Sequence, residues 1–382
     1  MIKKRNQAIV LLSNPMTFDI RPMTTASSLA QNGYDVTALC WDREGQNLRV
    51  EEFSPSFKIY RFALKSTYSQ KSSKLLGFLF FYAWCIFKSF SLKPKIIYCN
   101  DIDMLPLGLL IKYTQLSRVA LIYDMHDHPH IFVYRMPFSE LFEKLLLCIA
   151  RRYADHVIVV NDAFTSYLSN IGFDSEKITC IMNVSKIESS LISRHPVTSK
   201  LTIFYYGGIT RERGVDKLCD IIKDLSDVTL ILAGRGDLEE YIKIISNSQK
   251  NIRYIGWIDQ KEIDRIIAEE TDVIAILSDR FYVQSPLTHT LASPRKLFTG
   301  MALGLPVLVS EGSYMSEVVE RYHCGLVLDF TDLEKCKKEI EYLRDTPGLR
   351  IKLGKNGFNA ASNSFNWALM ETRLRELWCK FS

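Results

Sequence analysis

A glycine-rich segment in the second half of the chain carries side chains suited to holding phosphate. The apolar run Leu201–Tyr206 predicts a buried strand, and it is followed by Gly207, Gly208, Arg211 and Arg213 before a predicted helix. Glycines let the backbone approach a ligand closely, and a helix start offers unpaired N–H groups. Arginine adds donors that match phosphate oxygens. The segment therefore predicts either an anion site or a plain turn with solvated arginines.

Two other segments of the second half have a similar character. The turn Ala233-Gly234-Arg235-Gly236 follows another predicted strand, but it completes neither a dinucleotide fingerprint nor a P-loop. In Ser293-Pro294-Arg295-Lys296, serine is predicted to cap a helix that has proline at its first position. Cations in a first helical turn oppose the helix dipole unless an anion binds there. This favours a phosphate or carboxylate ligand over two side chains that simply point into water.

Histidines cluster at the end of a predicted strand in the first half. His126, His128 and His130 stand at alternate positions after the apolar run that begins at Ala120. Three such residues could hold a metal, but Pro129 interrupts the strand, and no remote cluster supplies further ligands. We therefore expect one functional histidine, His126, and no metal. No serine or cysteine nucleophile motif accompanies it.

Composition places the chain among globular proteins. Its 382 residues, 47% of them hydrophobic and 24% charged, are enough for two domains. The nine cysteines form no CxxC pair and the N-terminal apolar run is short, so we expect reduced thiols, no signal peptide and a cytoplasmic location. A net charge of +5 without a recognisable module does not indicate nucleic-acid binding.

Basic charge is concentrated in one apolar region. The stretch from Phe53 to Asn100 contains eight Lys and Arg residues and no acidic residue, and within it runs the apolar segment Leu75–Phe87. As a helix this segment is about 20 Å long, short of the ~30 Å bilayer core. Two alternatives remain: a core helix with solvated flanks, or a helix on an anionic membrane surface. The second would place Phe53–Lys95 on the inner face of the cytoplasmic membrane.

Short apolar runs alternate with helical patterns along the chain. This alternation is typical of parallel sheets covered by helices, and it predicts an α/β protein with two doubly wound domains facing a cleft. We predict one domain over residues 1–193 and another over 200–365, joined by the linker Leu191–Lys200, which contains Pro196. A final helix within 366–382 is expected to pack back on the first domain.

An ordered set of segments resembles the GT-B glycosyltransferases, most closely family 4, the retaining group that uses nucleotide sugars. The segments are Asp19-Ile20-Arg21, Leu29–Val36, Tyr123–Asp127, Ala154–Asn161, Tyr206-Gly207-Gly208, Arg213-Gly214, Leu232–Gly236, Ser293–Phe298 and Met301–Val307. The resemblance implies two Rossmann-like domains. It also implies transfer of a sugar from a nucleotide-diphosphate donor to a glycan or lipid-linked glycan, in surface polysaccharide or glycoconjugate biosynthesis. The donor is then a co-substrate, and neither metal nor cofactor is expected.

The resemblance also assigns roles to individual residues. Arg213 would hold the donor diphosphate and His126 would face the donor sugar. Lys296, the third catalytic residue, would take over part of the role of two glutamates common in the family and help to stabilise the leaving diphosphate. Donor-binding positions are Gly207, Gly208, Arg211, Gly234, Gly236, Ser293, Pro294, Leu297 and Thr299, and acceptor-side positions are Asp19, Arg21 and Asp127. The chain departs from the family at Leu291 and Thr299, where two glutamates are common, and at Gly208, where an arginine is usual.

These departures leave two alternatives open. A GT-B-shaped nucleotide-sugar epimerase shares the architecture, but it needs acidic groups in the cleft to move a proton. A catalytically impaired nucleotide- or glycan-binding protein is favoured by the missing carboxylates. Turnover with a panel of donor sugars distinguishes the three classes, while the sequence leaves the nucleotide, the sugar, the acceptor and the oligomeric state open.

Overall fold

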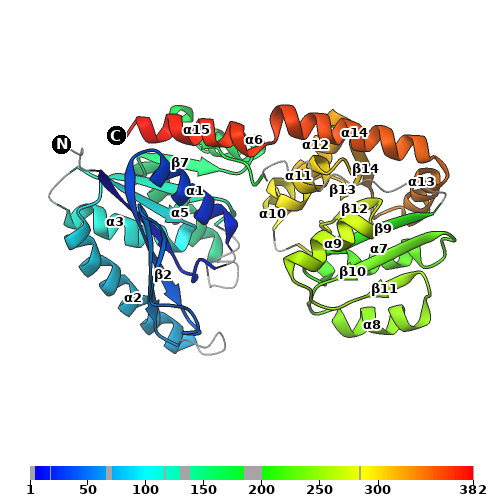
Figure 1. Cartoon of the computed structure of the whole chain (residues 1–382), viewed down its shortest axis with the longest axis horizontal. Helices are drawn as coiled ribbons and strands as arrows, with labels where there is room; N and C mark the ends of the chain where they lie inside the picture. Colours follow the sequence, from blue (N-terminus) through cyan, green and yellow to red (C-terminus); the bar gives the residue numbers. More distant parts are fainter. Residues whose placement is uncertain are drawn as a thin grey trace. The chain divides into compact units, whose positions relative to one another are not determined.

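The chain forms two compact units, each built around one sheet (Figure 1). The computed structural model describes residues 5–17, 19–65, 71–115, 118–129, 138–184, 200–283 and 285–381. The first unit comprises Met1–Met182 with Met370–Ser382, and the second comprises Asn183–Leu369. Apart from Lys200, the predicted linker lies outside the described residues. The predicted domain boundaries therefore stay predictions.

The first unit contains an eight-stranded sheet in the order β3-β4-β2-β1-β5-β6-β7-β8. The strands are β1 (Asn6–Leu12), β2 (Tyr34–Asp42), β3 (Val50–Ser54), β4 (Phe57–Ala63), β5 (Ile96–Asn100), β6 (Ala120–Met125), β7 (His156–Val159) and β8 (Ile178–Cys180). Neighbouring strands are parallel except for the antiparallel pair β3 and β4. The chain order turns at β1, since β2 lies on one side and β5 on the other. Ligands of such sheets bind at the carboxyl ends beside this turning point.

In the described residues, six α-helices belong wholly or mainly to this unit. They are α1 (Ile20–Gln31), α2 (Lys71–Leu92), α3 (Leu105–Thr114), α5 (Ser139–Tyr153), α6 (Asp162–Asn170) and α15 (Trp367–Cys379). The C-terminal helix α15 adds its buried residues to the first unit. Trp378 Nε1 donates to Ser28 Oγ on α1 at 3.2 Å, and its ring lies 6.1 Å from that of Tyr98.

The second unit contains a six-stranded parallel sheet in the order β11-β10-β9-β12-β13-β14. Its strands are β9 (Leu201–Tyr206), β10 (Val228–Ala233), β11 (Ile252–Tyr254), β12 (Val273–Ile276), β13 (Val307–Ser310) and β14 (Gly325–Leu328). The order turns between β9 and β12, so the loop after β9 lies where a doubly wound sheet binds its ligand.

In the part of the second unit that the structure describes, eight α-helices accompany the sheet. They are α7 (Val215–Ile222), α8 (Glu239–Ser248), α9 (Gln260–Glu270), α10 (Pro286–Leu291), α11 (Arg295–Ala302), α12 (Tyr314–Tyr322), α13 (Leu333–Asp345) and α14 (Pro347–Ser364). The amphipathic helix α7 shows why they form: Leu218, Cys219 and Ile222 are fully buried on one side, in the core beneath β9 and β10. Burial of such side chains contributes about 1.5–3 kcal/mol each.

Candidate functional site

Two glycine turns follow the carboxyl ends of β9 and β10, and their backbones contact each other. Gly207 N–H donates to the Ala233 carbonyl at 2.9 Å. Gly234 has a φ of +140°, and a Cβ there would collide with the carbonyl oxygen of Gly207. A Cβ on Gly236 would likewise collide with the carbonyl of Ile209. Only glycines allow this close approach, so the structure brings these predicted donor-binding residues together and leaves backbone exposed beside β9.

Lys296 reaches the same turn from the first turn of α11. Its ammonium donates to the Tyr206 carbonyl and lies 4.6 Å from the centre of the Tyr206 ring and 5.5 Å from that of Tyr205. Burial, with the nearby positive charge of Arg213, lowers the pKa of Lys296 to about 8. Two cations held this close repel each other, so an anion between them would be stabilised. Arg213 and Lys296 therefore both place positive charge near this turn.

The two arginines after the glycines lie on a short 3₁₀ turn, η4 (Arg211–Arg213). Arg213 is exposed, whereas Arg211 Nε lies 3.8 Å from Asp216 Oδ2 and its guanidinium lies 5.5 Å from the Tyr282 ring centre. Gly214, with a φ of +61°, ends this turn and begins α7. The predicted donor-binding role of Arg211 stays a prediction.

The start of α11 differs from the predicted one. The helix begins at Arg295, and Pro294 is its N-cap residue in an extended conformation, so the prediction that Ser293 caps the helix is wrong. Pro294 follows the serine directly and, with a φ of −69° and a ψ of 140°, keeps the chain extended for one residue more. Ser293 is buried, and its Oγ finds no hydrogen-bond partner among the described residues. Its hydroxyl is thus available to a ligand rather than used as a cap.

Two more predicted donor-binding residues lie further along α11. The Leu297 side chain is fully buried in the core, so only its backbone could contact a ligand. Thr299 Oγ1 donates to the Arg295 carbonyl at 3.1 Å. Leu291, the other position without the family's glutamate, is buried at the end of α10. The family's two carboxylates are thus replaced by one apolar side chain and one short hydroxyl.

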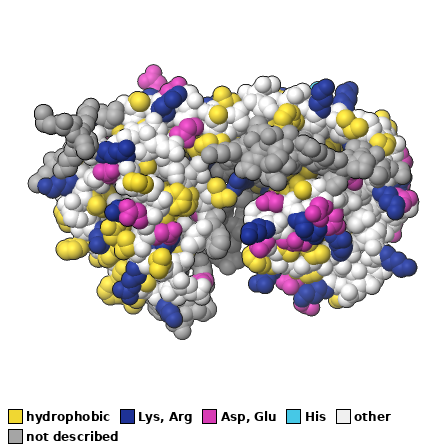
Figure 2. Space-filling view, viewed as in Figure 1, with side chains coloured by type: hydrophobic (Ala, Val, Ile, Leu, Met, Phe, Trp, Pro, Cys, Tyr) yellow, Lys and Arg dark blue, Asp and Glu magenta, His cyan; other side chains and the backbone are white. Residues whose placement is uncertain are grey.

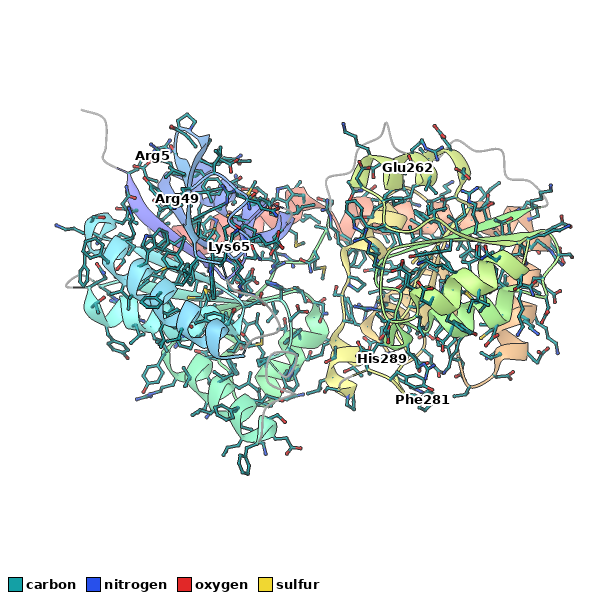
Figure 3. The ribbon with its side chains drawn as sticks, turned by 90° about the horizontal axis from the view of Figure 1, so that it is seen from below. Arg5, Arg49, Lys65, Glu262, Phe281 and His289 are labelled. Carbon is teal, nitrogen blue, oxygen red and sulfur yellow. The ribbon has the colours of Figure 1, made fainter. Side chains whose placement is uncertain are left out.

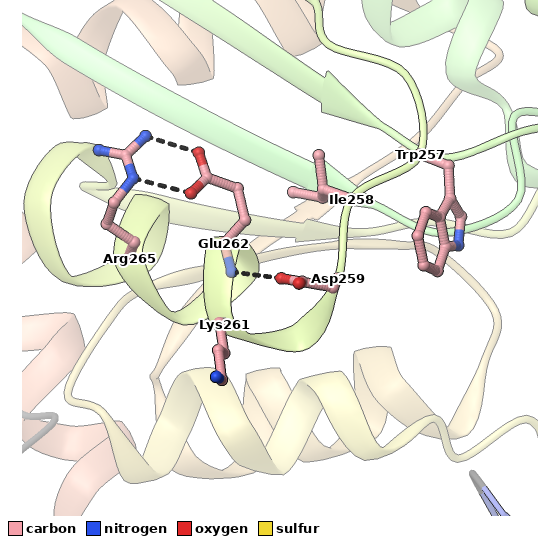
Figure 4. A pocket seen from close by; sticks show the side chains of 6 residues that line it. All are labelled: Trp257, Ile258, Asp259, Lys261, Glu262 and Arg265. Carbon is pink, nitrogen blue, oxygen red and sulfur yellow. Dashed lines mark hydrogen bonds and ion pairs between the residues drawn. The ribbon is translucent and has the colours of Figure 1, made fainter.

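An open hollow continues this surface toward β11 (Figure 4). It is lined by Trp257, Ile258, Asp259, Lys261, Glu262 and Arg265. Asp259 caps α9 by accepting from Glu262 N–H at 2.9 Å, and the exposed Trp257 ring lies 6.0 Å from the guanidinium of Arg235. Sequence analysis did not select Trp257. The sequence feature that could have identified it is a large aromatic residue directly after a glycine at a strand end.

The carboxyl ends of β12 and β13 hold a neutralised polar network, near the labelled Phe281 and His289 in Figure 3. Lys217 Nζ lies 2.7 Å from Asp279 Oδ2 and 5.2 Å from the Phe281 ring centre. The buried His289 ring pairs with Ser278 Oγ at 3.1 Å and with the Glu311 carbonyl at 2.8 Å. Within this network Lys217 neutralises the charge of Asp279, and the hydrogen bonds of His289 hold the neighbouring loops in place.

In the first unit a buried ion pair lies beneath the carboxyl ends of β5 and β6. Arg21 donates from Nε and Nη2 to the two carboxylate oxygens of Asp124 at 2.8 and 2.7 Å, and from Nη1 to the Ile181 carbonyl at 2.7 Å. The Tyr98 hydroxyl also bonds to Asp124. Burial raises the pKa of Asp124, but the charge and hydrogen bonds of Arg21 outweigh it, so the pKa is lowered. The predicted acceptor-side role of Arg21 stays a prediction, with its donors engaged here.

His126 pairs with an aspartate that sequence analysis did not select. His126 Nε2 lies 3.1 Å from Asp101 Oδ2, and the two residues directly follow the neighbouring strands β6 and β5. Burial lowers the pKa of His126, but the charge and hydrogen bond of Asp101, with the charge of Asp124, raise it to about 9. One sequence feature could have identified Asp101: like His126, it stands at the end of an apolar run.

Further polar atoms beside this pair lack hydrogen bonds. His126 Nδ1, Asp101 Oδ1, Asp103 Oδ1, the Tyr123 hydroxyl and Asn100 Oδ1 are buried without a partner among the described residues. Burial and the charge of Asp101 raise the pKa of Asp103 to about 6. Buried polar atoms are normally paired, so such a gathering needs a ligand or water. Donors and acceptors together suit a ligand rich in hydroxyl groups.

The histidines do not converge on one centre. His128 Nε2 lies 3.0 Å from the Tyr167 hydroxyl, and His130 lies outside the described residues. Polar atoms of Asp101, His126 and Asp127 do lie within 4.8 Å of one another. The expected absence of a metal stays a prediction. The remaining acceptor-side residue, Asp19, accepts from Asn14 Nδ2 at 3.1 Å.

Comparisons with known proteins identify the family of both halves of the chain. The model of "Glycosyl transferases group 1" matches residues 190–360, and that of "Glycosyltransferase Family 4" matches residues 23–184. No curated protein matches the chain in sequence. Among solved structures, sucrose-phosphate synthase from Thermosynechococcus elongatus is similar, with a TM-score of 0.78, 17% identity, and coverage of 98% of this chain and 99% of that one.

Two further structures share the fold. Anabaena HepE in complex with UDP-glucose has a TM-score of 0.73 at 17% identity, covering 98% of this chain and 99% of that one. WaaG, a glycosyltransferase involved in lipopolysaccharide biosynthesis, has a TM-score of 0.67 at 13% identity, covering 96% of this chain and 98% of that one.

Both halves of the chain thus match glycosyltransferase domains, and the chain belongs to the group 1 and family 4 glycosyltransferases of the GT-B fold. It is a nucleotide-sugar-dependent glycosyltransferase of class EC 2.4, as the resemblance predicted. The α/β architecture of two Rossmann-like domains is confirmed as well. In the part of the chain that the structure describes, no helix is both long and apolar enough to cross a bilayer.

Proposed function

We propose that this enzyme transfers a sugar, with retention of configuration, from a nucleoside diphosphate to a glycan or lipid-linked glycan acceptor. The observation that carries the proposal is the positive charge of Lys296 and Arg213 beside the half-buried glycine turn at Gly207. A diphosphate leaving group gains negative charge as its bond to the sugar breaks. Fixed cations aimed at that charge lower the barrier without a metal ion.

The residues suit a reaction on one face of the sugar. The bond between the anomeric carbon and the phosphate oxygen breaks, and its electron pair stays on the diphosphate. The acceptor hydroxyl oxygen bonds to the anomeric carbon from the same side, and its proton passes to the departing phosphate oxygen. Lys296, Arg213 and the unpaired Ser293 hydroxyl would stabilise that oxygen. One such donor contributes about 3–4 kcal/mol in a preorganised site.

The first test combines ligand binding with turnover. Thermal shifts with UDP, GDP, ADP and TDP identify the nucleotide, because a ligand stabilises the folded state in proportion to RT ln(1+[L]/Kd). Turnover is then measured with the matching sugars. We expect Arg213→Ala to lower turnover at least about tenfold. The matched control is Arg253→Ala, which removes an exposed arginine paired with Glu270 on the same unit.

Each outcome separates one alternative. Wild-type turnover in the Arg213→Ala variant would refute the proposed role of this cation. A nucleotide that stabilises the protein while no donor sugar is consumed would favour a catalytically impaired binding protein. Interconversion of the donor sugar without transfer would favour an epimerase.

We also propose that α2 docks on an anionic membrane that carries a lipid-linked acceptor. The helix is not buried on all sides: Phe81 and Cys85 are fully buried, but Leu79, Phe80 and Phe87 are 58%, 60% and 77% exposed. Figure 2 shows hydrophobic side chains mixed with Lys and Arg over this region. Apolar side chains that can enter the headgroup layer, flanked by lysines and without acidic residues, are what an interfacial helix requires.

Membrane docking is tested by co-sedimentation with liposomes. The protein is expected to pellet with vesicles of phosphatidylserine and phosphatidylcholine, to be released by salt, and to stay in solution with phosphatidylcholine alone. The triple change Leu79→Ser, Phe80→Ser and Phe87→Ser should abolish pelleting. The control Tyr342→Ser, which removes a 62% exposed aromatic residue from α13, should not. Equal binding to neutral vesicles, or none to either, would contradict the proposal.

A further inference from the structure

We propose that Asp279 is a positioning residue that holds the turn η4, and with it the guanidinium of Arg213, in place for a diphosphate. The part that concerns the diphosphate rests on the proposed function. The hold on η4 does not, because it follows from contacts within the second unit. Asp279 lies in the loop after β12, far from η4 in the sequence.

Turn η4 needs support from outside itself. It is only three residues long. Arg213 N–H donates to the Thr210 carbonyl at 3.0 Å, and Gly214 N–H donates to the Arg211 carbonyl at 2.9 Å. Hydrogen bonds of this 3₁₀ type have poor geometry, and such turns are rarely longer than a few residues. An element this short keeps a fixed shape only where its surroundings hold it.

Arg213 depends on the backbone of η4 for its position. The residue is exposed, and within the described part of the chain no hydrogen bond or ion pair holds its guanidinium. Its charge nevertheless acts at the glycine turn, since it lowers the pKa of Lys296. A cation stabilises a developing charge best when it is already in place before the reaction. Any movement of η4 therefore displaces the charge of Arg213.

Asp279 contacts the middle of η4 through its backbone. Its N–H donates to the Glu212 carbonyl at 2.8 Å. Strand β12 is the parallel neighbour of β9, so the segments that follow these two strands lie at the same edge of the sheet. The backbone of η4 is thereby joined to the end of the adjacent strand.

The Asp279 carboxylate contacts the helix that follows η4. Its Oδ2 lies 2.7 Å from Lys217 Nζ in the first turn of α7, and the Asp279 side chain is 1% exposed. Gly214 stands between Glu212 and Lys217, with a φ of +61°, and a Cβ there would collide with the Phe330 ring. One buried residue thus holds the chain on both sides of the glycine at which η4 ends and α7 begins.

The same residue keeps its own loop folded. Asp279 Oδ1 accepts from Phe281 N–H at 3.0 Å. The Asp279 carbonyl accepts from the N–H groups of Tyr282 and Val283 at 3.0 and 3.1 Å. The Tyr282 ring centre then lies 5.5 Å from the guanidinium of Arg211, the first residue of η4. The loop after β12 therefore contacts the start of η4, its middle and the helix beyond it.

A positioning role and a purely electrostatic role of Asp279 predict opposite effects on an anion. A carboxylate repels a nearby anion, so its removal alone would strengthen the binding of a diphosphate. If Asp279 positions η4, its removal instead misplaces Arg213 and weakens binding. A displacement of about 1 Å caused by a distant change can lower a rate about 100-fold. The direction of the change in affinity therefore identifies the role.

The first measurement is hydrogen exchange of the ligand-free full-length protein, followed by mass spectrometry. We expect Asp279→Ala to speed exchange in residues 207–215 at least about tenfold, because a charged hydrogen-bond partner is lost. In Asp279→Asn an amide oxygen can still accept from Phe281 N–H, so part of the protection should return. The matched control is Asp174→Ala, which removes another aspartate that accepts from a backbone N–H, that of Glu176 at 3.0 Å, in the first unit.

The second measurement uses inorganic pyrophosphate as the probe, with its affinity taken from thermal shifts at several concentrations. We expect Asp279→Ala to weaken pyrophosphate binding roughly tenfold and Arg213→Ala to weaken it at least as much. In the variant that carries both changes, loss of Asp279 should add less than about twofold, because it acts through Arg213. A merely structural role would weaken binding by the same factor in both backgrounds.

Unchanged exchange in residues 207–215 of Asp279→Ala would overturn the proposal. Tighter pyrophosphate binding by this variant, or an equal loss with and without Arg213, would overturn it as well. If the alanine variant does not fold, Asp279→Asn is carried through both measurements, and wild-type exchange and affinity in it would count against the proposal.

Neither measurement uses turnover, so a failure of the proposed transferase activity would be recognised separately. A wild-type protein that binds no pyrophosphate would contradict the diphosphate site of the proposed function. The exchange of residues 207–215 would then still decide whether Asp279 holds η4.

Discussion

At the scale of single residues, the two units concentrate opposite charges at the carboxyl ends of their sheets. In the first unit Asp101 and Asp124 act on His126, whereas in the second unit Lys296 and Arg213 stand beside glycine turns. Cations suit a departing diphosphate, and a carboxylate-rich pocket suits hydroxyl groups.

The Arg21–Asp124 ion pair makes a prediction about stability. Arg21→Met leaves a fully buried carboxylate without its cation, so the free energy of unfolding at pH 7 should fall by about 3–5 kcal/mol. The measurement is urea denaturation followed by circular dichroism. As a control, Arg152→Met removes an exposed arginine of α5 and should change the free energy of unfolding by less than about 0.5 kcal/mol.

The deficit, which is the loss in free energy of unfolding caused by Arg21→Met, should depend on pH. In the wild-type protein the pKa of Asp124 is lowered on folding, so its contribution is present above the unfolded pKa of about 3.9 and is lost as the pH falls. Without Arg21, burial raises the pKa, and protonation then favours the folded state. The deficit should therefore shrink between pH 7 and pH 4.5. A deficit that stays below about 1 kcal/mol or grows on acidification would contradict this prediction.

At the scale of elements, the sequence was informative where burial and turn chemistry agree. Strands β9 and β10 have the predicted bounds, because each is a buried apolar run that ends at a glycine. Strand β3 was missed, since the residues of Val50–Ser54 are mostly exposed and show no alternation. Helix α14 was missed because its glycines are poor helix formers. One of them, Gly354, lies where a Cβ would collide with the Gly304 carbonyl, so the helix depends on tertiary contact.

The candidate site shows the same difference between residues marked by the local sequence and residues brought together by tertiary contact. His126 and Lys296 were found because their types are unusual at a strand end and in a first helical turn. Asp101 was missed because it is far from His126 in sequence, and only the pairing of β5 with β6 makes them neighbours. The cap at Ser293 was predicted wrongly because the local pattern does not specify where an extended Pro294 lets the helix begin.

At the scale of the whole molecule, the first unit is assembled from the two ends of the chain. Residues up to Met182 supply the sheet, and the segment from Met370 adds the last helix. Its contacts are specific: Tyr34 donates from its hydroxyl to the Trp378 carbonyl at 3.3 Å, and the indole donates to Ser28 Oγ at 3.2 Å. The C-terminal segment is therefore part of the first unit's core rather than a free extension.

Trp378→Ala tests this assignment. The side chain is 1% exposed, and its loss should destabilise the first unit by about 3–5 kcal/mol through the cavity and the lost hydrogen bond to Ser28. Hydrogen exchange followed by mass spectrometry should show faster exchange in β1, β2 and β5 and unchanged protection in β9 and β10. Trp257→Ala, which removes a 63% exposed indole from the second unit, serves as the control and should leave β1, β2 and β5 protected. Equal loss of protection in both sheets would show that the C-terminal helix stabilises the chain as one cooperative body, whereas no loss in either would remove it from the core.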